Sequence, residues 1–153
     1  MTHDAHDHGS TRQGDVGAPP APRHVLTILA VADLARASRF YGEAFGWPAA
    51  VEVPVYVELA LPGGQRFGLY QREGFARNVG LVPAAPAVGA ITATEVYLQC
   101  DDLGTTVERV TSAGGRLLSA RAPRPWGDEV AYFADPDGNV LALAGPLPSN
   151  TSA

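Results

Sequence analysis

The sequence predicts an α+β fold in which two βαβββ repeats form a curved mixed sheet that cups a pocket. The main observation is an internal repeat: Asp33-Leu34 recurs as Asp102-Leu103, an offset of 69 residues, and the same offset relates Gly46 to Gly115. In both copies an apolar segment of strand length precedes the aspartate, and an amphipathic helical stripe follows it. Because one copy alone would leave a sheet face open, the second copy is needed to bury or enclose that face.

The first copy begins with the apolar run Val25–Val31, which has the length and the aliphatic content of a strand. Asp33 follows in the position of an N-cap, where its carboxylate accepts backbone N–H bonds of the first helical turn. Gly46 then favours a helix C-terminus. The apolar residues between them have helical spacing: Leu34, Ala37, Phe40, Tyr41, Ala44 and Phe45. Three short strands are expected next, around Ala50–Val53, at Val55–Leu61 and at Arg66–Gln71.

The second copy repeats this order. Thr94–Cys100 is expected to be a strand, Asp102 an N-cap, and Gly114-Gly115 the end of the helix. The helical stripe consists of Leu103, Thr106, Val107, Val110 and Ala113. Strands are expected near Arg116–Ala120, Glu129–Ala134 and Asn139–Leu143, and the turn Asp135-Pro136-Asp137-Gly138 joins the last two.

The predicted organisation is one chain of two modules with a linker and two tails. The segments are a disordered His/Pro-rich tail at 1–22, a first βαβββ module at 23–78, a linker at 79–92, a second βαβββ module at 93–146 and a flexible tail at 147–153. Three of the four histidines lie in the first tail. Whether they, or His24, bind a metal is left open.

Composition excludes several classes of function. All 11 basic residues of the 153-residue chain are arginine, so the lysine-dependent Schiff-base and phosphate-loop chemistries are absent. With a net charge of −5 and no basic stripe, we expect no nucleic-acid partner. The apolar runs are too short to span a membrane, and the N-terminus has no signal-peptide core. Cys100 is the single cysteine, so no internal disulfide forms, and we expect a cytoplasmic protein.

Two motifs, taken with the repeat, resemble a known family. The first is Ala32-Asp33-Leu34 leading to Phe40-Tyr41 and Phe45-Gly46, and the second is Phe133-Ala134-Asp135-Pro136-Asp137-Gly138-Asn139. Over residues 24–145 the chain is similar to the vicinal oxygen chelate superfamily of glyoxalases, bleomycin resistance proteins and extradiol dioxygenases. The resemblance implies paired βαβββ modules and a two-fold homodimer that completes its pocket across the interface. It does not choose a function, because the superfamily contains both metalloenzymes and metal-free binding proteins.

The metal-ligand positions of the superfamily lack donors in this chain. Carried over residue by residue, they fall on Leu26, Gly68, Glu95 and Ala142, and only Glu95 has a donor atom. One carboxylate is too few for a catalytic divalent metal. We therefore expect neither a metal nor another cofactor, with His24, on the same strand face as Leu26, as the single possible substitute ligand.

If the position of Glu95 faces the pocket, strand alternation selects its neighbours. The expected ligand-binding residues are Glu95, Tyr97, Gln99, Tyr56, Glu58, Tyr70 and the loop residue Trp126. Each has a structural alternative: Glu95 can pair with an arginine, the tyrosines can complete the sheet surface, and Trp126 can pack a loop. Alternation leaves open whether Tyr132 or Phe133 reaches the pocket.

Three functional hypotheses follow. The first is a metal-independent small-molecule-binding protein that sequesters a planar or cationic compound such as an antibiotic, as resistance members of the superfamily do. The second is a lyase or isomerase in which Glu95 acts as acid and base, with its pKa raised by burial among Leu26, Ile28 and Ala142. The third is a non-catalytic partner domain with a vestigial pocket. The sequence does not identify the ligand.

Overall fold

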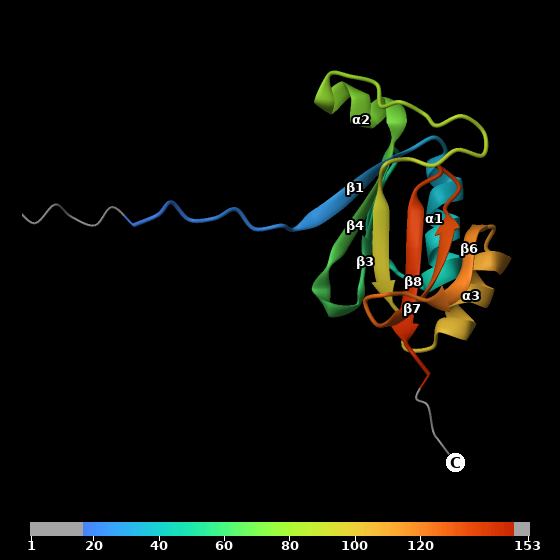
Figure 1. Ribbon diagram of the computed structural model, residues 1–153. Helices are drawn as coiled ribbons and strands as arrows, with labels where there is room; N and C mark the ends of the chain where they lie inside the picture. Colours follow the sequence, from blue (N-terminus) through green and yellow to red (C-terminus); the bar gives the residue numbers. More distant parts are fainter. Residues whose placement is uncertain (1–16, 149–153) are drawn as a thin grey trace, which may run out of the picture.

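Residues 17–148 are the part of the chain that the computed structural model describes. Within this part the chain forms eight strands, three α-helices and one short 3₁₀ turn, η1 (Figure 1). In chain order they are β1 (Leu26–Val31), α1 (Leu34–Phe45), β2 (Ala49–Val53), β3 (Tyr56–Ala60), η1 (Pro62–Gly64), β4 (Arg66–Gln71), α2 (Arg72–Val79), β5 (Glu95–Gln99), α3 (Leu103–Ser112), β6 (Arg116–Pro123), β7 (Asp128–Ala134) and β8 (Val140–Pro146). None of these helices is long and apolar enough to cross a bilayer.

The strands form two four-stranded sheets with the same topology. Their orders are β1-β4-β3-β2 and β5-β8-β7-β6, with the first pair of each sheet parallel and the other pairs antiparallel. The predicted pair of βαβββ repeats is therefore confirmed. Hydrogen bonding divides the predicted curved sheet into two separate sheets, one from each module.

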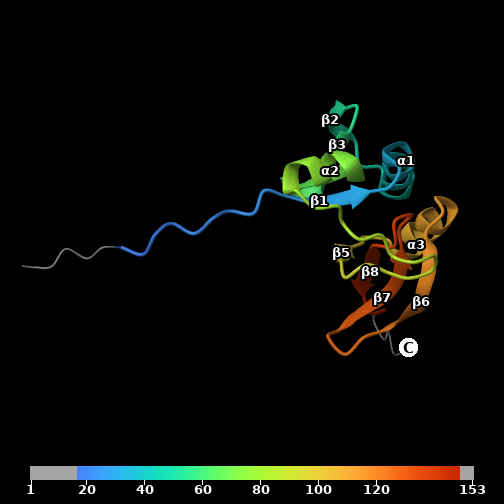
Figure 2. The ribbon, with the colours of Figure 1, turned by 90° about the horizontal axis from the view of Figure 1, so that it is seen from above.

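One hydrophobic core spans both modules. Helices α1 and α3 pack side by side against one face of each sheet (Figure 2), and Nη2 of Arg109 donates to the carbonyl of Glu43 across the helix pair at 3.1 Å. The core combines Phe40 and Tyr41 of α1 with Leu69 and Phe133 from the two sheets. The opposite face of each sheet does not pack on these helices, and we call it the open face.

The predicted helix caps are present. The Asp33 carboxylate accepts the backbone N–H of Arg36 at 3.0 Å, and the Asp102 carboxylate accepts that of Thr105 at 3.0 Å. Gly46 has the left-handed backbone (φ 69°) that ends α1. Because an aspartate N-cap starts both helices, the two copies share their local hydrogen bonds as well as their residue pattern.

Helix α2 differs from the sequence prediction, which passes directly from a strand to the linker in this region. The signals for it are short-range ones: Glu73 lies in its first turn, Arg77 in its last, and Gly80 (φ 86°) ends it. The rings of Phe75 and Tyr70 pack roughly at right angles, with centroids 6.3 Å apart. Strands β6 and β8 each end three residues beyond their predicted ends. Residues 1–16 and 149–153 of the predicted tails lie outside the described part.

Candidate functional site

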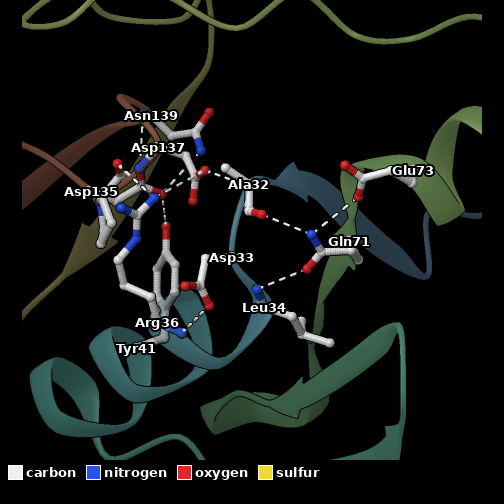
Figure 3. A network of polar contacts seen from close by, with 11 residues as sticks. Ala32, Asp33, Leu34, Arg36, Tyr41, Gln71, Glu73, Asp135, Asp137 and Asn139 are labelled. Carbon is white, nitrogen blue, oxygen red and sulfur yellow. Dashed lines mark hydrogen bonds and ion pairs between the residues drawn. The ribbon is translucent and has the colours of Figure 1, made fainter.

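The turn between β7 and β8 ties the two modules together (Figure 3). Oδ2 of Asp135 accepts the Tyr41 hydroxyl at 2.6 Å, while its Oδ1 accepts the backbone N–H groups of Asp137 and Asn139, each at 2.9 Å. Burial, and then the neighbouring negative charge of Asp135, raises the pKa of Tyr41 well above its ordinary value. Tyr41 therefore remains a hydrogen-bond donor, and Asp135 is a structural acceptor.

A second set of bonds holds the corner between β1 and α1. Oδ1 of Asp137 accepts the backbone N–H of Ala32 at 2.8 Å. Gln71, at the end of β4, accepts the N–H of Leu34 at 3.0 Å and donates to the carbonyl of Ala32 at 2.7 Å. Figure 3 shows these groups converging on the corner. The motifs that carried the family resemblance thus serve to join elements.

On the open face of the first sheet, aromatic rings cover a glycine. The hydroxyl of Tyr56 donates to Oε2 of Glu58 at 2.7 Å, and its ring lies 5.4 Å from that of Tyr70. A Cβ on Gly68 would lie 2.8 Å from the Tyr56 hydroxyl, so the ring of Tyr56 occupies the space beside Gly68, one of the four positions at which the family resemblance implied a metal ligand. Burial and the bond to Glu58 raise the pKa of Tyr56 to about 12. Arg66 lies 3.7 Å from Glu58 and offsets its charge.

On the open face of the second sheet, an exposed aromatic pair is held in place by a carboxylate. The indole Nε1 of Trp126 donates to the hydroxyl oxygen of Tyr97 at 2.9 Å, and that hydroxyl donates to Asp128 at 2.5 Å. Trp126 and Tyr97 are 57% and 42% exposed, which is large for aromatic side chains. Sequence reasoning did not identify Asp128, because its role depends on the loop geometry.

The strand register shows which of Tyr132 and Phe133 lies on the open face. Tyr132 pairs with Ala142, which in turn pairs with Tyr97, so Tyr132 lies on the open face while Phe133 is buried in the core. The guanidinium of Arg124 stacks over the Tyr132 ring at 5.1 Å. Arg124 is a second open-face residue that the sequence did not reveal.

Glu95 lies exposed on β5, at the edge of its sheet, with Gln99 four residues on. Among residues 17–148, no arginine or histidine forms an ion pair with it. The ion-pair alternative therefore has no support in a single chain. The burial among Leu26, Ile28 and Ala142 that the acid/base hypothesis requires is also absent in one chain, because Glu95 is exposed.

The donor set does not fit the divalent metal of the superfamily's metalloenzymes. Ile28 pairs with Gly68, and Tyr97 pairs with Ala142. Leu26 and Glu95 each lie two residues before these partners, and therefore on the same faces of the sheets. Leu, Gly and Ala offer no donor, and in the described part no three His, Cys, Asp or Glu side chains gather. Nε2 of His24 lies 3.1 Å from Oγ1 of Thr27.

Among the cavities of residues 17–148 are three of about 370 to 390 Å³, and these three lie away from most of the predicted site. Of the seven predicted residues only Gln99 lines any of them, in a cavity between the end of α1 and the start of α3. Cys100 lines the same cavity, and burial raises the pKa of its thiol. The other six residues gather instead on the two open faces, as one cluster in each module.

The sequence matches the model of a known protein family. A family model described as the Glyoxalase/Bleomycin resistance protein/Dioxygenase superfamily matches residues 22–143. The chain belongs to this superfamily. The match runs from just before β1 into β8, so the glyoxalase-like fold covers both modules and the helix pair between them.

The chain is also similar to individual proteins. A glyoxylase-like domain-containing protein from Didymella fabae is 30% identical over 118 residues, which cover 72% of this chain and 84% of the relative. A glyoxalase-related enzyme from Fulvimarina pelagi has a TM-score of 0.72 at 24% identity, covering 82% and 88% of the two chains. A lactoylglutathione lyase from Agrobacterium tumefaciens has a TM-score of 0.61 at 23% identity, covering 82% and 95%. At these identities the two solved structures show the glyoxalase fold alone.

Proposed function

We propose that the protein is a metal-independent small-molecule-binding member of the glyoxalase superfamily, which holds a planar compound against the aromatic side chains of its open faces. The observation that carries the proposal is the Tyr97–Trp126 pair. Its two rings are exposed, yet hydrogen bonds to each other and to Asp128 hold them in one arrangement. A preorganised aromatic surface binds a flat ligand at a low cost in side-chain entropy.

Fewer acidic side chains are available to attract a cationic ligand than the sequence indicated. Glu58 already accepts a bond from Tyr56 and faces Arg66, so its charge is offset. Glu95 and Asp128 are the acidic groups beside the aromatic pair that can attract a positive ligand, and Asp128 is engaged by Tyr97. The proposed ligand therefore carries a planar ring, and Glu95 is the carboxylate left to attract a positive group on it.

We place the complete pocket at a two-fold homodimer interface. Each chain leaves Tyr97 and Trp126 exposed on the open face of its second module, and exposed apolar surface of this kind favours association. A two-fold axis would bring the first-module cluster of one chain, with Tyr56 and Tyr70, opposite the second-module cluster of its partner. This arrangement would also remove Glu95 from water, which the single chain does not do.

A fluorescence titration tests the proposed function. The chain has two tryptophans, of which Trp47 is buried and Trp126 exposed, so a ligand on the open face should change mainly the Trp126 signal. Binding is measured for a panel of planar aromatic amines and their uncharged analogues. Replacement of Trp126 by Ala should weaken binding about tenfold or more. Binding to this variant is measured by calorimetry, because the Trp126 fluorescence is lost. Val88→Ala, which alters an exposed linker residue, is the control and should bind as wild type does.

Failure to bind any planar compound at millimolar concentration would reject the proposal. So would a Trp126→Ala protein that binds as tightly as wild type.

A further inference from the structure

A cavity of about 380 Å³ lies at the junction of the two modules, away from the open faces. Its walls come from the corner after β1, the start of α2, the linker at 85–90 and the β7–β8 turn. Three arginines line it, Arg36, Arg72 and Arg116, together with Asp137. None of these belongs to the aromatic clusters, so the cavity is a separate feature of the molecule.

The arginines that line this cavity are only weakly engaged. Nη2 of Arg36 lies 3.8 Å from Oδ1 of Asp137 and donates to the Pro136 carbonyl at 3.4 Å. Arg116 donates to the carbonyl of Ala90, also at 3.4 Å. These contacts are long for charged groups, whose good hydrogen bonds are near 2.8 Å. The other carboxylate of the lining, Asp135, is already saturated by Tyr41 and by groups of its own turn. The cavity therefore has an excess of positive charge.

Two buried polar atoms in the lining residues have no partner within residues 17–148. One is the donor Nε of Arg72, and the other is the acceptor Oδ2 of Asp137. Asp137 as a whole is only 8% exposed, so water reaches it poorly. Buried polar groups are almost always hydrogen-bonded, so this donor and this acceptor, both on residues that line one cavity, each call for a partner that residues 17–148 do not supply.

We propose that this cavity binds a small oxyanion that keeps an acidic proton, with hydrogen phosphate as the simplest case. The arginines supply donors and positive charge for the phosphate oxygens. The P–OH group donates to Oδ2 of Asp137, which an anion without a proton cannot do. Sulfate has the same shape but carries no proton at neutral pH, so it would face the Asp137 carboxylate with like charge. The cavity should therefore distinguish phosphate from sulfate.

Calorimetric titration of the full chain with sodium phosphate or sodium sulfate, at pH 7 and constant ionic strength, tests this proposal. Phosphate should bind at least tenfold more tightly than sulfate. Arg72→Gln and Arg116→Gln should each weaken phosphate binding at least fivefold. Arg39→Gln removes an exposed arginine of α1 that does not line the cavity, and should leave binding unchanged. Because Arg116 is exposed, its replacement keeps the test valid even where Arg72→Gln disturbs folding.

Asp137→Asn is the decisive variant. The amide keeps its oxygen for the N–H of Ala32 and places a donor where the second carboxylate oxygen was. Sulfate should then bind at least as tightly as phosphate. The proposal is overturned by absence of phosphate binding at about 10 mM, by equal binding of the two anions to wild type, or by equal losses in Arg39→Gln and Arg116→Gln. Failure on these points would leave the open-face proposal untouched, because the two sites share no residue.

Discussion

The hydroxyl of Tyr41 donates a 2.6 Å hydrogen bond to Oδ2 of Asp135, and this contact joins the first module to the second. Tyr41 belongs to the Phe-Tyr motif of α1, and Asp135 opens the Asp-Pro-Asp-Gly turn. The two motifs that indicated the superfamily are therefore partners in space, 94 residues apart in sequence. Such a pair identifies a fold and leaves the activity undetermined, because neither side chain is free to react.

Replacing Tyr41 with Phe should destabilise the protein by about 1.5–3 kcal/mol, the range for a lost bond to a charged acceptor. Asn139 still donates to the same oxygen at 3.0 Å, so the loss should stay within that range. Urea unfolding measures it. Tyr70→Phe is the matched control, because the Tyr70 hydroxyl is bonded only in an exposed contact with Asn78. Equal free energies of unfolding for wild type and Tyr41→Phe would contradict the structural role assigned here.

Asp137 should make the stability depend on pH. Burial raises the pKa of its carboxyl above the unfolded value of 3.8, with the neighbouring Asp135 adding to the effect and Ala32, Arg36 and Arg72 opposing it. A raised pKa means that the folded state binds the proton more tightly, so this contribution to stability is present below pH 3.8 and is lost as the pH rises through the folded pKa.

Asp137→Asn cannot ionise, and its free energy of unfolding relative to wild type should therefore increase between about pH 3 and pH 7. Unfolding both proteins in urea across this range gives the difference directly. A relative stability that falls with rising pH would show that the attraction of Arg36 and Arg72 outweighs the burial of the carboxylate.

Adding a methyl group at Gly68 should distort the first open face. The new Cβ would lie 2.9 Å or less from both Tyr56 and Ile28, so Gly68→Ala should destabilise the protein by about 1–3 kcal/mol. Gly42→Ala is the control: nothing lies within 4 Å of its added Cβ, and in a helix the change should stabilise by about 0.5–1 kcal/mol. If the Gly68 variant is as stable as wild type, Tyr56 does not fill the position of the missing ligand.

Glu95→Gln should affect ligand binding and leave folding unchanged. Its side chain is exposed and makes no ion pair among the described residues, so the free energy of unfolding should change by less than about 0.5 kcal/mol. A planar cation should bind about tenfold more weakly, while its uncharged analogue should not. Glu52→Gln on the exposed strand β2 is the control for surface charge. A large loss of stability would indicate an ion pair formed across the dimer.

The parts of the fold predictable from sequence were those that depend on local chemistry. Asp33 and Asp102 as caps and the alternation along β5 follow from neighbours within a few residues. Helix α2 was missed because its signals are short and lie beside a Pro/Ala-rich linker. The anchoring of Tyr97 by Asp128, and the convergence of arginines on one cavity, join residues from distant segments, and no periodicity in the sequence reports such contacts.

Native mass spectrometry of the protein purified from its own host, after dialysis against a chelator, tests the central claim most directly. The account predicts a species at twice the 16.0 kDa chain mass that retains a small organic molecule and no metal, with the molecule absent from Trp126→Ala. One Zn, Ni, Mn or Fe ion retained per chain, or a ligand-free monomer at micromolar concentration, would contradict it.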